Sequence, residues 1–214
     1  MKLYKLTDEN DRDYSGFQWG EGIEYIADIE GGIYWNNVVS GYTHPLLAVF
    51  LNHIPKKYST HLWECDGDVT IADHGLKVGC TRFKTIRRIP LPQITSTQKA
   101  RFAILCGLEV CRYDKVWINW AKNWLNGTDQ SKQSTLAMLK MIKEEKLLPT
   151  ILAIEDAVSD ATWTVAAVTI WMTEEMPVWK GGGPMTVQAV VAENAARIAR
   201  LDLIALAKKA TEEK

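Results

Sequence analysis

The sequence predicts an α+β protein, with a strand-rich N-terminal module (residues 1–92) packed on a C-terminal helical bundle (residues 93–214). Three observations predict this class. Short runs with strand character, separated by glycines and charged turns, fill the first part of the chain. Pro90 and Pro92 end that pattern, and the segments from Ile94 onward have helical periodicity. Two heptad-like stripes then occupy the last third of the chain.

The N-terminal module is expected to contain several short strands. The strand candidates are residues 2–6, 23–27, 33–35, 61–65, 69–72 and 83–89, with a charged turn over 8–13. Asp66-Gly67 lies between two of these runs and is a strong signal for a hairpin turn. We therefore expect residues 61–72 to form a hairpin that turns at this pair.

One short helix is expected within this module, over residues 44–51. Thr43 or His44 can cap it, and Pro45 suits the first helical turn. Because a helix N-terminus favours anions, His44 is either a simple cap or part of an anion site.

The C-terminal part begins with a T-x-x-Q capping box formed by Thr95 and Gln98. The following helix is apolar on nearly every side over residues 102–110, which predicts a central, buried position. In the next helix, which Asp114 can cap and Gly127 can end, one face is formed by Trp117, Trp120, Ala121 and Trp124. This tryptophan face is either core or a stacking surface. A third helix is expected over residues 131–146.

Two heptad-patterned helices are expected at about 150–173 and 185–209, separated by Pro177 and a Gly-Gly-Gly-Pro break. Their apolar positions alternate in spacings of three and four residues, as a and d positions do. The stripes either pair within the chain or assemble copies of it. The candidate assembly residues are Val158, Val165, Val191, Asn194 and Ile198, and the single Asn is of the kind that fixes register.

Composition and charge narrow the function classes. Of the 214 residues, 47% are hydrophobic and 24% charged, as in an ordinary globular protein. A formal net charge of −1 argues against broad nucleic-acid binding, because proteins that track phosphates carry a basic excess. We expect a cytoplasmic protein, since the N-terminus lacks the apolar run of a signal peptide and no apolar run of about 18 residues exists.

The four cysteines are expected to be free thiols. Cys65, Cys80, Cys106 and Cys111 form no C-x-x-C pair, and the last two would point in different directions from a helix. Buried thiols in a reducing compartment fit this pattern, and neither a metal nor another cofactor is predicted.

The sharpest polar cluster begins at Thr60 and continues along the last expected strand. Together with the cap residue, the candidate ligand-binding residues are His44, His61, Glu64, Asp73, His74, Lys77, Arg82, Lys84 and Arg88. Two histidines among carboxylates can bind a metal or do acid–base work, although no known metal motif is present, whereas a solvated hairpin edge explains most of the same residues. Strand alternation would place Lys84 and Arg88 on one face and Arg87 with Phe83 on the other, where they could serve a phosphate-bearing ligand.

A family resemblance extends over most of the chain. The segments Phe17-Gln-Trp-Gly-Glu-Gly, Gly41-Tyr-Thr-His-Pro-Leu-Leu, Leu62-Trp-Glu-Cys-Asp-Gly-Asp and Ile86-Arg-Arg-Ile resemble an uncharacterised family of bacteriophage and prophage proteins. The helical segments Trp120-Ala-Lys-Asn-Trp-Leu-Asn-Gly and Ala161-Thr-Trp-Thr-Val-Ala-Ala are similar to its Ala- and Trp-rich second part. The resemblance implies a phage or prophage origin and brings no catalytic residue with it.

These observations favour a non-enzymatic binding protein. A phage-encoded inhibitor or ligand sponge, acting on a host or defence factor in the host cytoplasm, fits the heptad stripes and the missing catalytic motif. Two alternatives remain open: an enzyme acting on a nucleotide or NAD-like substrate, and a structural or assembly protein. The expected partners are a protein or a small nucleotide-like ligand, or further copies of the chain, and no membrane.

Overall fold

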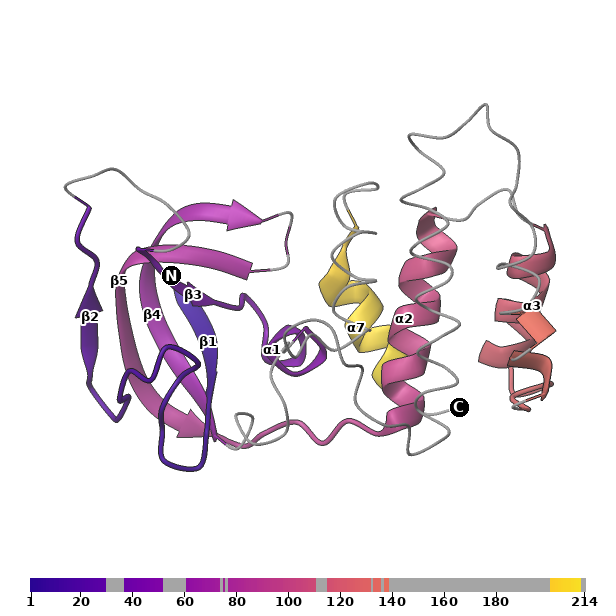
Figure 1. The fold of residues 1–214 in the computed structure, drawn as a ribbon, viewed down its shortest axis with the longest axis horizontal. Coiled ribbons are helices and arrows are strands. Elements are labelled where there is room, and N and C mark those ends of the chain that lie inside the picture. The colour runs from indigo at the N-terminus through magenta and orange to yellow at the C-terminus, as the bar shows by residue number, and fades with distance from the viewer. Residues whose placement is uncertain are drawn as a thin grey trace. The chain divides into compact units, whose positions relative to one another are not determined.

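The structure is a computed structural model with two compact units (Figure 1). It describes residues 1–29, 37–51, 61–73, 75, 77–110, 115–131, 133–135, 137–138 and 201–212. The first unit contains Met1–Gln93, and the second contains the described residues from Ile94 onward. A five-stranded antiparallel sheet in the first unit and helices in the second confirm the α+β class.

The sheet unit contains five strands and one short helix. Its elements are β1 (Lys2–Thr7), β2 (Glu24–Ile26), β3 (Val39–Gly41), α1 (Pro45–Phe50), β4 (His61–Asp73) and β5 (Lys77–Ile89). The strand order is β1-β4-β5-β2, and β3 also pairs with β5. Tyr4 and Tyr42 exchange backbone hydrogen bonds of 2.8 and 2.9 Å, so the chain just after β3 returns to the free edge of β1.

The two faces of the sheet pack different groups, because side chains alternate along each strand. One face holds the larger core, in which Leu3, Trp63 and Phe83 pack with Trp19 from the loop between β1 and β2. The other face is apolar where Leu6 and Leu62 pack against Ala48 of α1, and charged further along the same strands.

The predicted turn at Asp66-Gly67 is wrong. Both residues lie inside β4, which continues to Asp73, and the chain turns near Gly75, whose φ is +82°. Gly67 serves close packing instead. A Cβ at this position would lie 3.0 Å from both Cys80 Sγ and Leu3 Cδ1. Glycine therefore fits at position 67 because the interior leaves no room for a side chain there.

Other local predictions for the sheet unit are confirmed. The first strand, the charged turn after it and the last strand are present, and His44 caps α1 by accepting a 3.2 Å hydrogen bond from the Leu46 amide at Nδ1. The strand expected over residues 33–35 lies outside the described residues.

The helical unit contains α2 (Ser96–Val110), α3 (Lys115–Leu125) and α7 (Leu203–Thr211). The capping box is confirmed: the Gln98 amide donates to Thr95 Oγ1 at 3.1 Å, and the Thr95 amide donates to Gln98 Oε1 at 2.9 Å. α2 is buried from Phe102 through Cys106, and α3 buries the predicted tryptophan face. Gly127, with φ +76°, follows the end of α3 as expected.

The uninterrupted helix expected over residues 185–209 is wrong at its end. Asp202 is non-helical and caps α7 through a 3.0 Å hydrogen bond from the Ala205 amide. The buried stripe of α7 is Leu203, Ala207 and Ala210, while Ala205 is exposed. The helix expected at 150–173 lies outside the described residues, as do Asp114, residues 139–146 and the candidate assembly residues Val158, Val165, Val191, Asn194 and Ile198. No helix in the described part of the chain is long and apolar enough to cross a membrane.

Candidate functional site

The structure divides the candidate ligand-binding residues into separate groups. His61 and Arg88 lie where β4 begins and β5 ends, while Asp73 and Lys77 are cross-strand partners at the opposite end of this hairpin. Glu64, Arg82 and Lys84 lie between them, and His44 caps α1. His74 lies outside the described residues. The single cluster expected from the sequence is therefore spread along the hairpin.

The middle group is a network of ion pairs. Arg82 contacts Asp66 at 2.6 Å, Asp68 at 2.9 Å and Glu24 at 3.2 Å. The hydrogen bond from Arg82, with one from the N-terminal ammonium group, lowers the pKa of Asp66 to about 2. Arg82 is thus surrounded by carboxylates, and it is poorly placed to bind an added anion.

A β-bulge changes the predicted distribution of the basic side chains. Glu64 pairs in register with Arg87, whereas Cys65 pairs with Thr85, so β5 has one extra residue at Ile86. Arg87 lies 3.0 Å from Glu64, and the Arg88 guanidinium lies over the Trp63 ring at 5.2 Å. The expected grouping of Arg88 with Lys84, and of Arg87 with Phe83, is therefore wrong.

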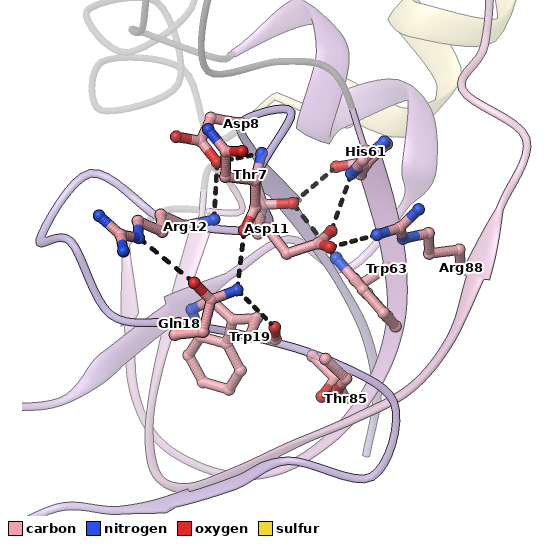
Figure 2. A network of polar contacts seen from close by, with 12 residues as sticks. Thr7, Asp8, Asp11, Arg12, Gln18, Trp19, His61, Trp63, Thr85 and Arg88 are labelled. Atoms are coloured by element: carbon pink, nitrogen blue, oxygen red, sulfur yellow. Dashed lines mark hydrogen bonds and ion pairs between the residues drawn. The ribbon is translucent and has the colours of Figure 1, made fainter.

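The remaining group is centred on a residue that the sequence did not single out, Asp11. Its Oδ1 lies 2.8 Å from His61 Nδ1, and its Oδ2 accepts a hydrogen bond from Arg88 Nη2 (Figure 2). The aspartate comes from the loop after β1, the histidine from β4 and the arginine from β5. We call these three residues the Asp11 cluster.

The loop holds Asp11 in a defined position. Asp8 Oδ1 accepts a hydrogen bond of 2.7 Å from the Arg12 amide (Figure 2). It also accepts one of 2.8 Å from the Asn10 amide. Asp11 itself has φ +61°, a left-handed conformation that costs free energy for a residue with a Cβ. Its carbonyl accepts from the Trp19 amide at 2.8 Å. Such strained residues persist where their surroundings fix them, often at functional sites.

A buried ion pair anchors the same loop to the sheet. Lys5 Nζ lies 3.2 Å from Asp13 Oδ2 and 5.2 Å from the centre of the Trp19 ring, and the Trp19 indole donates to Asp13 Oδ2 at 2.9 Å. Burial alone would raise the pKa of Asp13, but the Lys5 ammonium and the hydrogen bonds outweigh it and lower the pKa. The loop is therefore held by the Asp8 hydrogen bonds before and around Asp11 and by the Lys5–Asp13 ion pair after it.

The Asp11 cluster offers hydrogen-bonding groups beyond those used within it. With Nδ1 facing Asp11, the imidazole of His61 presents Nε2 as its second hydrogen-bonding atom. A guanidinium has five N–H donors, and the Arg88 side chain is 49% exposed. The arrangement can hold an anionic group, and a carboxylate–imidazole pair can also move a proton.

The described cysteines are unsuited to nucleophilic chemistry. Cys65, Cys80 and Cys106 are free and buried, as predicted, and burial raises the pKa of Cys65 to about 12 and that of Cys80 to about 11. Their thiolate forms are therefore scarce near neutral pH. Cys111 lies outside the described residues, and no group of three metal-binding side chains occurs within the described ranges.

Sequence reasoning missed Asp11 because its partners are distant in the chain. His61 is 50 residues away and Arg88 is 77 residues away. The available signal was a charged turn without glycine, Asp8-Glu-Asn-Asp-Arg-Asp13, in which one residue must adopt an unusual conformation to reverse the chain. That signal identifies the turn, but it does not show which distant residues Asp11 contacts.

Comparisons of this chain with family models, with curated proteins and with solved structures find no match.

Proposed function

We propose that this protein is a non-enzymatic binding protein that holds a small anionic, phosphate-bearing ligand at the Asp11 cluster. The observation that carries the proposal is the Asp11 carboxylate, which orients an imidazole and a half-exposed guanidinium side by side. Guanidinium groups suit phosphate because their parallel N–H donors match its oxygens.

The neighbouring cations support this choice of residue. Arg82 and Arg87 have carboxylate partners on the other face of the sheet, and Lys84 is exposed there. Arg88 rests on the Trp63 ring and meets a single carboxylate among the described residues. Its planar group is therefore oriented before any ligand arrives, which reduces the entropy lost on binding.

A binding role fits the chemistry better than catalysis does. The described thiols are buried and protonated, so a cysteine mechanism has no nucleophile in this part of the chain. A phage-encoded sponge or inhibitor would bind a nucleotide-like ligand of a host or defence pathway, in the host cytoplasm, and the family resemblance of the sequence motivates this setting. No cofactor is required for such a role.

The test is ligand-dependent thermal stability with the ligand recovered afterwards. Inorganic phosphate, ADP and a cyclic dinucleotide serve as probes. We expect a saturable rise in melting temperature with at least one of them, with the probe recovered intact. Arg88→Gln should remove this shift, while Arg87→Gln, one residue away on the opposite face, should retain it. Equal loss in both variants would contradict the assignment to the Asp11 cluster.

An enzyme acting on a nucleotide or NAD-like substrate is the second candidate, because the 2.8 Å contact between Asp11 and His61 resembles a general-base pair. Turnover separates the two roles. If a cleaved probe is recovered and His61→Gln abolishes the cleavage, the binding-only proposal fails. If His61→Gln weakens binding and no product forms in either protein, the catalytic candidate fails.

A further inference from the structure

One of the sheet edges that no described strand covers belongs to β2. The outer edge of β1 is hydrogen-bonded at Tyr4, to the backbone of Tyr42, whereas β2 ends the strand order beyond β5 (Figure 1). β2 is short, but its extended backbone bonds to β5 continue from Ile23, which accepts from the Thr85 amide, to Ala27, which donates to the Thr81 carbonyl.

The pairing pattern shows which backbone groups of β2 face outward. In an antiparallel pair, residues alternate between those bonded to the neighbouring strand and those pointing away from it. Ile23 and Ala27 are bonded to β5, so Tyr25 is bonded as well, and the N–H and C=O groups of Glu24 and Ile26 point to the open edge. Two donors and two acceptors are thus arranged for another strand.

The side chains along this edge lack the usual protection against strand pairing. Natural edges are commonly guarded by lysine or proline. The three residues of β2 are Glu24, Tyr25 and Ile26, and the Ile26 side chain is 72% exposed on the same face as Glu24. Ile23 and Ile29, which flank the strand, are also exposed.

The charge of the segment indicates which kind of strand would fit. From Asp13 to Asp28 the sequence contains Glu21 and Glu24 and has no lysine or arginine. Glu24 shares the Arg82 guanidinium with Asp66 and Asp68, so carboxylates outnumber the cation there, and Glu21 is exposed. An incoming strand would therefore meet an acidic edge with an apolar contact at Ile26, which favours basic and apolar side chains over acidic ones.

We infer that the open edge of β2 binds an extended segment of a partner protein in which a basic and an apolar residue lie two positions apart, on one face of that strand. The partner strand hydrogen-bonds to the backbone of Glu24 and Ile26. It places a basic side chain beside Glu24 and an apolar side chain beside Ile26. The surface shares no residue with the Asp11 cluster, so it is a second, independent binding site of the sheet unit.

Hydrogen exchange in the whole chain tests this inference, with the synthetic peptide acetyl-Thr-Lys-Thr-Val-Thr-amide as the probe, in which Lys and Val share one face of the strand. We expect saturable binding and slower exchange of the Glu24 and Ile26 amide protons, because both become hydrogen-bonded. Ile26→Lys should weaken binding at least tenfold. Ile86→Lys, which changes an exposed isoleucine of β5 away from this edge, should leave the affinity unchanged.

Three results would overturn the inference. One is binding without any change in the exchange of these two amides. Another is equal binding of the matched peptide acetyl-Thr-Glu-Thr-Val-Thr-amide, which would remove the charge argument. The third is dimerisation of the protein, measured by sedimentation, that Ile26→Lys abolishes, because a second copy would then be the occupant of the edge.

Discussion

Replacing Lys5 with methionine tests how the loop that carries Asp11 is held. Lys5 and Asp13 are 10% and 13% exposed and lie 3.2 Å apart, so solvent screens their attraction only weakly. Removing one partner of a buried pair costs about 3–5 kcal/mol, because the other charge stays buried without compensation. We expect the lower end, about 3 kcal/mol, since Asp13 keeps hydrogen bonds from Ser15, Phe17 and Trp19.

The assay is urea unfolding followed at the indole N–H resonance of Trp19, which reports on the sheet unit. The matched control is Lys2→Met in the same strand. Lys2 is 58% exposed and lies 3.1 Å from Glu64, so solvent screens this pair and its loss should change the unfolding free energy far less than the loss of Lys5 does. If Lys5→Met were no more destabilising than Lys2→Met, the proposed anchoring of the loop would be refuted.

The same pair predicts a dependence on pH. The folded-state pKa of Asp13 is lowered, so its contribution to stability is fully present above the unfolded pKa of the carboxyl group. It is lost as the pH falls through the lower, folded value. In Lys5→Met this acid-dependent loss should become smaller, because the ammonium group that helps to lower the pKa is gone. An unchanged acid dependence in the variant would indicate that the hydrogen bonds alone set the pKa.

Three further predictions concern the rest of the sheet unit. Gly67→Ala should destabilise the protein by about 1–3 kcal/mol in chemical denaturation, because the added Cβ meets Cys80 Sγ at 3.0 Å; an unchanged stability would contradict the close packing. Arg82→Gln should raise the pKa of Asp66 from about 2 towards the ordinary 3.8 in a carbon-13 titration; the stability that this carboxyl contributes above its unfolded pKa, lost in the parent protein as the pH falls through about 2, should shrink as the two pKa values approach each other. Cys65 should react with a thiol reagent at pH 8 only at the rate of unfolding, since burial raises its pKa to about 12; rapid labelling of the folded protein would refute its burial.

Local signals predicted the fold most reliably. Thr95 and Gln98 lie three residues apart, so their capping box depends on nothing outside its own helix turn. The tryptophan face of α3 follows from helical spacing in the same way. His44 was also predicted as a cap, and its position before Pro45 is sufficient to explain it.

Predictions failed where distant residues decide the structure. Asp66-Gly67 has the composition of a turn, but close neighbours from β1 and β5 require glycine within a continuous strand. The bulge at Ile86 moved Arg88 to the other face, and alternation along one strand does not reveal it. Asp11 joined the site only because the loop after β1 brings it to the end of the hairpin where β4 begins and β5 ends.

The most direct measurement of the central claim is nitrogen-15 NMR of the histidine and arginine side chains during titration with ADP or inorganic phosphate. If the Asp11 cluster is the binding site, the signals of the His61 imidazole and the Arg88 guanidinium should shift and saturate together. The guanidinium of Arg82, held by three carboxylates, should not respond. Saturable binding that shifts the Arg82 signal and leaves those of His61 and Arg88 unchanged would contradict the account.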